Sequence, residues 1–211
     1  MNHMASITAD LPTGITRTDR SGGLAAITEP ACAAVIWERL SDPGFQDWID
    51  GLDQARLPMA RLILNVGEVR SALADACDTY QTPDSPERAQ LVEDIVSLAS
   101  VFADLMKTQH LRLRLSAVDT NACRRFHIDA VTARLICTYR GTGTQLGLSA
   151  DDAEPRRILS VPTGVPLVLR GSNWPEHPAS GLLHRSPPID GTGETRLVLV
   201  LDPIFDPEEA A

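Results

Sequence analysis

The sequence is poor in aromatic side chains, which make up 4% of its 211 residues. Its hydrophobic content of 43% is nevertheless ordinary for a globular protein. The core must therefore be built mainly from Leu, Val, Ile and Ala. A chain of this length can form one substantial domain.

Cysteine is also scarce. The four cysteines are widely spaced, and no two of them form a C-x-x-C pair. A chain of this size with so few cysteines is not a disulfide scaffold. We therefore expect reduced thiols and a cytoplasmic protein.

Long apolar runs and a surplus of basic charge are missing too. No stretch reaches the ~18 apolar residues of a bilayer-crossing helix, and no basic-then-apolar leader opens the chain. The net charge of −9 disfavours nucleic acid and anionic membranes, which attract basic surfaces. We expect neither partner. The first six residues, MNHMAS, resemble a cloning remnant, so residues 1–6 are set aside.

Helical patterns dominate residues 7–108, which we interpret as an N-terminal arm followed by a helical part. The clearest pattern follows Ser85, a good N-cap residue, and Pro86, which suits the first helical position. Apolar residues then recur at steps of three and four, as on one face of a helix. The run Met59–Asn65 fits either a strand or a helix. The predicted helices cover residues 30–40, 45–54, 67–80 and 85–108.

The period changes to that of a strand after Thr108. Leu111, Leu113 and Leu115 alternate with arginines, which is typical of a half-buried strand. Further short strands are predicted at residues 132–139, 144–148, 157–160, 165–169, 180–183 and 196–201. We predict an α+β protein in which residues 109–206 form a β-sandwich or barrel. The N-terminal helices are expected to pack on one face within one integrated domain.

The segment Cys123–Tyr139, CRRFHIDAVTARLICTY, carries the strongest candidate for chemistry. Its His127 and Asp129 are two residues apart, so in an extended chain both side chains point to the same face. A second His would complete the two-His, one-carboxylate triad of non-haem iron sites. His184 follows a short apolar strand and is the first candidate, while His177, in a loop, is the reserve.

Arg196 begins an apolar strand about twelve residues after His184. The Pro- and Gly-containing turn between them predicts adjacent antiparallel strands. An inward Arg is costly unless it is paired, and its planar fork matches a carboxylate. The sequence thus predicts a carboxylate receptor beside the metal site. A structural ion pair of Arg196 with Asp202, Asp190 or Glu194 stays open.

This order of H-x-D, short strands, distal His and Arg resembles the iron(II)- and 2-oxoglutarate-dependent oxygenases. The resemblance implies a double-stranded β-helix, a jelly-roll or cupin-like barrel with the metal inside. It implies iron(II) bound by His127, Asp129 and His184. Arg196 would bind the distal carboxylate of 2-oxoglutarate, and Tyr139 would hydrogen-bond this co-substrate. The implied activity is that of a dioxygenase or hydroxylase acting on a small molecule or a protein side chain.

More narrowly, the run CRRFHIDAVTARLICTYRGTGT is similar to an uncharacterised bacterial family, domain of unknown function family 1826. This resemblance implies a link to zinc homeostasis and to a metallochaperone GTPase partner. Zinc in the same His/Asp/His site, with Cys123 as a reserve ligand, is therefore an alternative to iron. A metal-free β-sandwich interaction module is a third interpretation. The helical half is left open as a pocket wall, a partner surface or a homodimer interface.

Overall fold

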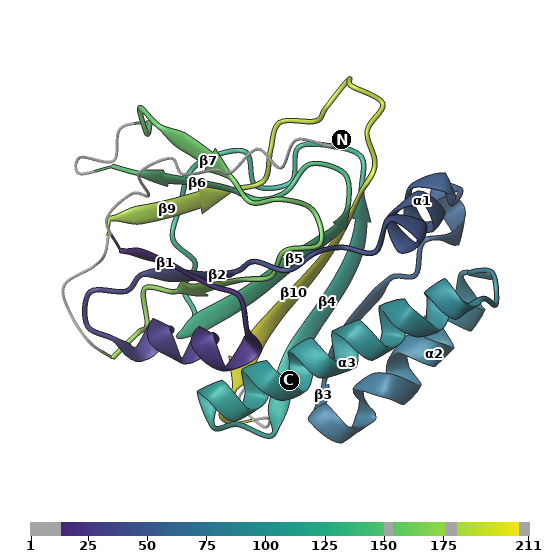
Figure 1. The fold of residues 1–211 in the computed structure, drawn as a ribbon, viewed down its shortest axis with the longest axis horizontal. Helices are drawn as coiled ribbons and strands as arrows, with labels where there is room; N and C mark the ends of the chain where they lie inside the picture. The colour runs from purple at the N-terminus through teal and green to yellow at the C-terminus, as the bar shows by residue number, and fades with distance from the viewer. Residues whose placement is uncertain (1–13, 150–153, 176–180, 207–211) are drawn as a thin grey trace.

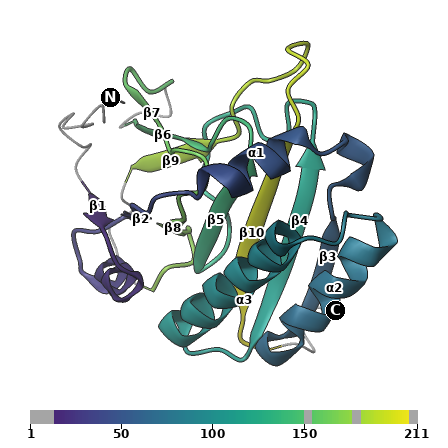
Figure 2. The same ribbon diagram turned by 45° about the vertical axis from the view of Figure 1, so that its right-hand side comes forward.

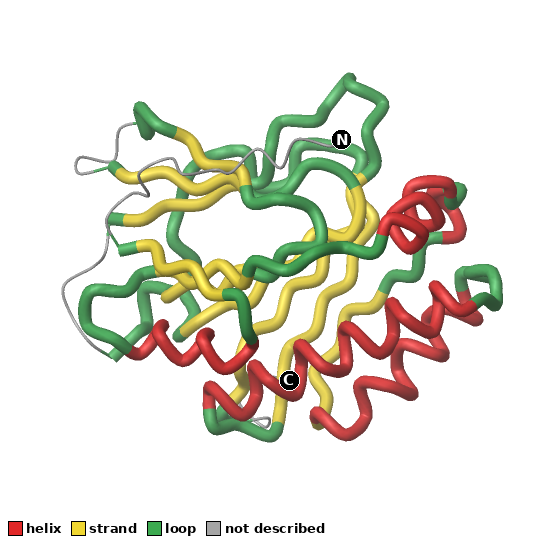
Figure 3. Tube along the Cα trace, viewed as in Figure 1, coloured by secondary structure: helices red, strands yellow, loops and turns green. Residues whose placement is uncertain are grey.

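Two β-sheets and three α-helices form the framework of the described part of the protein (Figures 1 and 3). The computed structural model describes residues 14–149, 154–175 and 181–206. The larger sheet has seven strands in the order β1-β2-β8-β5-β10-β4-β3, and the smaller has three in the order β7-β6-β9. The expected mixture of helices and strands is confirmed.

The strands of the large sheet are β1 (Ile15–Thr18), β2 (Ala34–Trp37), β3 (Ala60–Asn65), β4 (His110–Val118), β5 (Ala133–Arg140), β8 (Leu167–Arg170) and β10 (Arg196–Ile204). Those of the small sheet are β6 (Gln145–Leu148), β7 (Ile158–Ser160) and β9 (Leu182–Arg185). The helices are α1 (Pro43–Gly51), α2 (Val69–Thr79) and α3 (Pro86–Met106), with short 3₁₀ helices η1 (Ser21–Thr28), η2 (Gln54–Arg56) and η3 (Val66–Glu68).

Capping residues define both ends of helix α3. The Ser85 hydroxyl accepts a hydrogen bond from the Arg88 N–H, and Pro86 occupies the first turn. Lys107 ends the helix in the left-handed conformation, with φ of 54°. The predicted helix is confirmed. No helix within the described ranges is long and apolar enough to cross a membrane.

Alternate residues of β4, β5 and β10 point to opposite sides of the large sheet. One side, here called the helix face, packs against α3 (Figures 1 and 2) through residues such as Leu113, Leu135 and Leu199. The other side, here called the cavity face, turns toward the small sheet and carries Ile136 and Val198. Because side chains alternate with a period of two, each strand contributes to both sides.

A second apolar cluster fills the space between the two sheets. Leu146 of β6 and Leu182 of β9 pack against Ile36 and Leu169 of the large sheet. The small sheet therefore covers part of the cavity face, in the manner of a sandwich.

The predicted helix over residues 30–40 is wrong, because this segment contains strand β2. Ala34 and Ile36 pack between the sheets while Val35 packs on the helix face, so the strand is buried on both sides. A strand buried on both sides has a continuous apolar run, which gives no period-two signal. Together with β1 and β3, it places three strands from residues 7–108 in the same sheet as the later strands.

Candidate metal centre

His127, Asp129 and His184 converge at one point between the two sheets. Each offers one ligand atom, and these three atoms lie within 4.8 Å of one another. Asp129 Oδ2 lies 2.9 Å from His184 Nε2, and Asp129 Oδ1 lies 3.4 Å from His127 Nε2. Two imidazoles and one carboxylate thus share a small volume.

The backbone holds the two histidines opposite each other. His127 lies in the segment between β4 and β5, and its N–H and C=O bond the C=O and N–H of His184 in β9, each at 3.0 Å. Residues paired in this way direct their side chains to the same face. The two ring centroids are accordingly 4.5 Å apart.

A glycine allows the loop after β8 to lie directly against the H-x-D segment. Gly171 N–H donates to the carbonyl of Thr132, and Ser172 N–H donates to that of Asp129, both at 2.9 Å. A Cβ at position 171 would lie 1.9 Å from the carbonyl oxygen of Val131, so another residue would push this loop away. The close approach fixes the backbone that carries Asp129.

A backbone carbonyl sets the tautomer of His127. Its Nδ1 lies 2.8 Å from the carbonyl oxygen of Arg125, which can only accept a hydrogen bond. Nδ1 must therefore carry the proton. The lone pair of Nε2 is then free and directed to the side of Asp129, as a metal ligand requires.

Asp129 is ionised in a partly buried position. Burial alone would raise the pKa of its carboxyl, but the contact with His184 and the charges of Arg134 and His127 outweigh burial and hold the pKa below its usual range. Its Oδ2 is buried and lies 2.9 Å from His184 Nε2 and 2.5 Å from Arg134 Nη1. The ionised carboxylate and the two imidazoles together form a donor set suited to a divalent cation.

Two arginines of the cavity face form a charged network behind Asp129. Arg134 Nη1 lies 2.5 Å from Asp129 Oδ2, and Arg134 also binds both oxygens of Asp202, at 2.6 and 2.8 Å. Arg114 Nη2 reaches the same Asp202 at 3.3 Å. The almost fully buried carboxylate of Asp202 thus offsets the charge of Arg134.

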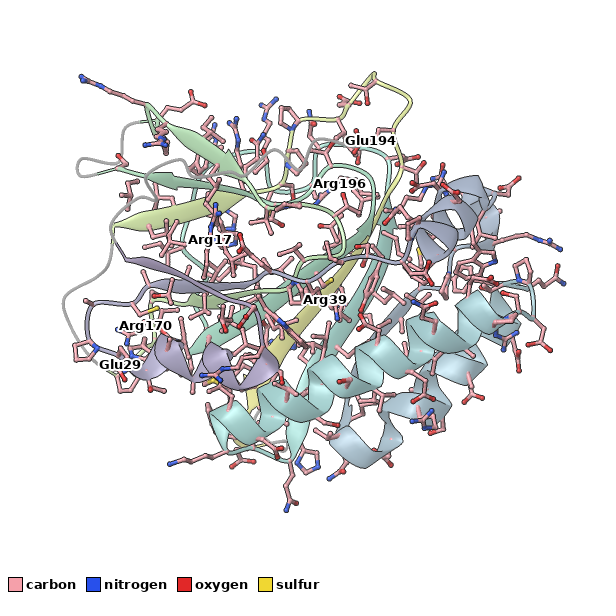
Figure 4. The ribbon with its side chains drawn as sticks, viewed as in Figure 1. Arg17, Glu29, Arg39, Arg170, Glu194 and Arg196 are labelled. Carbon is pink, nitrogen blue, oxygen red and sulfur yellow. The ribbon has the colours of Figure 1, made fainter. Side chains whose placement is uncertain are left out.

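Arg196 is buried to 2% exposure in the same region. Its Nε donates to the carbonyl of Thr142 at 2.6 Å, and Nη2 lies 3.4 Å from Thr138 Oγ1. Burial lowers the pKa of Arg196 to about 10, and the charge of nearby Glu194 opposes the shift. Figure 4 shows both residues at the start of β10, apart from Arg39.

The structural ion pairs considered for Arg196 do not form among the described residues. Asp202 is taken by Arg134 and Arg114. Glu194 instead accepts hydrogen bonds from the N–H and hydroxyl of Thr142. Arg196 is therefore a buried, charged fork whose partners within 14–149, 154–175 and 181–206 are neutral oxygens.

A cavity of about 170 Å³ links Arg196 to the two histidines. Its floor is the cavity face of the large sheet, and its other wall includes His127 and His184. The floor residues are Arg114, Ser116, Arg134, Ile136, Val198 and Val200. This volume is below the ~300–1,000 Å³ typical of drug-sized ligands, so it suits a small molecule.

Tyr139 does not line this cavity, and the role expected for it is corrected. The expectation assumed that Cys137 and Tyr139 point inward, but both point to the helix face. The Tyr139 hydroxyl donates to Asp94 Oδ2 of α3 at 2.6 Å. Thr138, one position earlier on β5, points to the cavity face, and its hydroxyl lies near Arg196.

The predicted adjacency of the strands that carry His184 and Arg196 is also wrong. β9 belongs to the small sheet and β10 to the large one, so the segment between them crosses from one sheet to the other. That segment contains Pro187 and Pro188, and Pro lacks the N–H that a ladder needs. The two residues face each other across the cavity instead.

The reserve ligands have different outcomes. Cys123 is exposed and lines the cavity, and its carbonyl accepts from Ser186 N–H. Its sulfur is not part of the three-residue cluster found in the described part of the chain. His177 lies outside the described residues.

Arg134 and Arg114 are site residues that the sequence analysis did not single out. A signal was available, because Arg134 has the same parity on β5 as Ile136, and Arg114 alternates with buried leucines on β4. A charged residue at an inward position of a strand needs a partner. Two more inward arginines would have indicated a strongly basic cavity floor.

Comparison with solved structures finds a similar fold in two dioxygenases for auxin oxidation. Dioxygenase for auxin oxidation 1 from Arabidopsis thaliana, in binary complex with 2-oxoglutarate, gives a TM-score of 0.54 at 9% identity, covering 95% of this chain and 98% of that chain. The dioxygenase for auxin oxidation in rice gives 0.51 at 12% identity, covering 93% and 84%. At these identities the likeness defines the fold alone: mixed helices and strands with one large sheet.

The sequence itself defines the family. The profile of the family described as "Protein of unknown function (DUF1826)" matches residues 18–202, and the chain belongs to this family. A search of curated proteins found no match.

Proposed function

We propose that the protein is a non-haem iron(II)- and 2-oxoglutarate-dependent oxygenase, built on a double-stranded β-helix with helices packed on one face. The observation that carries the proposal is a His/Asp/His cluster whose two histidines share one small cavity with a buried Arg196, and the described hydrogen-bond partners of Arg196 are neutral oxygens. A metal site alone fits many proteins. A dedicated carboxylate receptor opposite it fits a metal enzyme that uses a dicarboxylate co-substrate.

The three side chains fit a divalent cation. Ligands at neighbouring corners of an octahedron with bonds of ~2.1 Å lie ~3.0 Å apart. The distance of 2.9 Å between Asp129 Oδ2 and His184 Nε2 is close to this value, and one ligand atom from each of the three residues lies within 4.8 Å of the others. The tautomer of His127 and the ionised Asp129 give the lone pair and the charge that ligation needs. His127, Asp129 and His184 would therefore hold the iron.

Arg196 would bind the far carboxylate of 2-oxoglutarate. Its guanidinium is held by Thr142 and Thr138, so its fork is oriented before the ligand arrives. When bound, iron(II) and 2-oxoglutarate supply the oxygen chemistry, in which oxidative decarboxylation to succinate drives substrate oxidation. The contribution of the protein is to position the groups.

The apolar floor and the buried network serve the same purpose. Ile136, Val198 and Val200 limit water between the cluster and Arg196. Arg134 keeps Asp129 ionised and oriented, and Asp202 holds Arg134. The site thus combines fixed charges with a restricted volume.

An anaerobic titration tests this proposal. Addition of iron(II) and 2-oxoglutarate to the full chain should produce a weak visible charge-transfer band. Arg196→Ala should weaken 2-oxoglutarate binding and the band, whereas His127→Ala should abolish the band. Thr163→Ala, whose hydroxyl bonds the backbone of Gly141, is a control that should leave the band intact.

Zinc is the second candidate, favoured by Cys123, whose position on the cavity offers a thiolate near the cluster. In that case zinc would bind tightly, Cys123→Ser would weaken it, and no band would form with iron(II) and 2-oxoglutarate. That combined result would replace the oxygenase by a zinc-binding protein of metal homeostasis.

A further inference from the structure

A second hollow lies outside the histidine pair. It is a groove of about 620 Å³, and His127 lines both this groove and the inner cavity. Its volume lies within the ~300–1,000 Å³ range of small-ligand sites. The groove therefore gives a small molecule a route to one edge of the candidate metal centre.

The groove is basic although the chain as a whole carries a net charge of −9. Among the described residues, three arginines line it, against one acidic residue, Glu154. Arg185 is already engaged: it pairs with Glu154 at 3.0 Å and stacks on the Phe126 ring at 4.4 Å. Within the part of the chain that the structure describes, this pairing leaves the other two positive charges of the groove without an acidic partner.

Arg124 and Arg125 are the two remaining arginines. Both are exposed, and within the described ranges neither side chain makes a hydrogen bond or an ion pair. They immediately precede Phe126 and His127, so they lie beside the site. Two adjacent unpaired guanidinium groups at the rim of a groove are suited to bind a carboxylate or a phosphate.

The rest of the lining is apolar. Phe126, Ile128 and Leu183 are partly buried and contribute an aromatic ring and two branched aliphatic chains. The Arg185 guanidinium holds the Phe126 ring in place. A ligand that fits both kinds of surface has an apolar body and an anionic end.

We propose that this groove binds the primary substrate, and that the substrate is a small amphipathic anion carrying a carboxylate or phosphate group. Arg124 and Arg125 bind the anionic end, and the apolar body lies on Phe126, Ile128 and Leu183 and extends toward His127. The role of this ligand as a substrate rests on the proposed oxygenase function. The anion-binding groove itself does not depend on the metal.

Calorimetric titration of the full chain with benzoate, phenyl phosphate and uncharged benzamide tests the proposal. Without metal, benzoate or phenyl phosphate should bind at least about tenfold more tightly than benzamide, because two Arg–anion contacts of ~0.7 kcal/mol each correspond to about that ratio. The preference between benzoate and phenyl phosphate identifies the anionic group. Equal binding of benzamide would overturn the proposal.

A matched pair of double variants locates the site. Arg124→Ala/Arg125→Ala should weaken binding of the preferred anion about tenfold. Arg156→Ala/Arg157→Ala removes the same charge from another exposed pair, outside the groove, and should have less than about a twofold effect. Equal losses in the two variants would mean general charge attraction, and no loss in the first would exclude the groove.

The same titration with iron(II) and 2-oxoglutarate bound separates the two proposals. Because His127 borders both spaces, the preferred anion should shift the visible band. If the visible band forms but no anion binds, the proposed anion-binding groove is wrong and the proposed oxygenase is unaffected. If the anion binds but no band forms, the proposed oxygenase is wrong, and the ligand is then not its substrate. The anion-binding site would still stand.

Discussion

The two sides of the large sheet are built from the same strands for different purposes. On the helix face, the alternate residues are leucines in β4 and β10 and mainly apolar residues in β5, and they pack in one core with α3. On the cavity face, the intervening residues include Arg114, Arg134 and Arg196. One side of each strand therefore supplies stability, and the other supplies charged groups that cost stability unless something binds them.

Two arginines show this difference most clearly: Arg39, which is partly buried, and Arg196, which is almost fully buried. Arg39 binds both oxygens of Asp94, at 2.5 and 2.7 Å, and this pairing outweighs the effect of burial and raises the pKa of Arg39. Arg196 has no such carboxylate among the described residues, and burial lowers its pKa. A paired buried arginine is a structural element, whereas one with only neutral partners indicates a ligand site.

Core truncation on the helix face should have the largest effect. Leu113→Ala should lower the free energy of unfolding by about 3 kcal/mol, since a fully buried leucine leaves a cavity. Val200→Ala on the cavity face should cost only about 1 kcal/mol, because Val200 borders open space. Chemical denaturation measures both free energies of unfolding. Equal losses would contradict the inference that the helix face contributes more to stability than the cavity face.

The paired and unpaired arginines should respond in opposite ways. Asp94→Ala leaves Arg39 and the buried Tyr139 hydroxyl without their acceptor and should cost about 2 kcal/mol of unfolding free energy. Arg196→Met removes a buried charge and should leave stability unchanged or raise it by about 1 kcal/mol. A large destabilisation by Arg196→Met would show that Arg196 is structural, and would weaken the proposed function.

The sequence predicted elements best where one side of the chain faces solvent or a single partner. The cap at Ser85 predicted α3 nearly to its ends, and the alternation around Leu113 located β4. The prediction of secondary structure from the sequence was wrong where a strand is buried on both sides. The segment of β2 was predicted as a helix. The alternation along β5 did not reveal whether Tyr139 points to the helix face or to the cavity face.

The candidate site shows the same limit. The order of His127, Asp129, His184 and Arg196 in the sequence predicted a cluster and a nearby receptor. The structure brings the first three residues together and places Arg196 on the same cavity as the two histidines. Sequence spacing could not reveal that β9 and β10 lie in different sheets, because that depends on long-range packing. The sequence offered a signal for Arg134, an inward position on β5 close to Asp129, but it could not reveal the pairing of Arg134 with the distant Asp202.

Arg134 offers a sharper test within the cavity face itself. Its charge is offset by Asp202, so its main effect on the candidate centre should be to orient Asp129. Arg134→Gln should weaken iron(II) binding about tenfold. Arg114→Gln, which also loses a contact with Asp202, is the control and should change binding less than about twofold. Tighter binding in Arg134→Gln would mean that charge repulsion outweighs orientation.

The smallest predicted effect concerns the support of Arg196. Glu194 holds the N–H and hydroxyl of Thr142, and the Thr142 carbonyl in turn accepts from Arg196 Nε at 2.6 Å. Glu194→Gln keeps one acceptor oxygen but removes the charge, so Thr142 should stay nearly in place while the receptor loosens. The affinity for 2-oxoglutarate, followed by the band, should fall about threefold, as expected for a partly exposed charge. Thr142→Ala removes only the hydroxyl contact and should have a still smaller effect. If Glu194→Gln lowers the affinity as much as Arg196→Ala does, then Glu194 acts directly on the ligand rather than through Thr142.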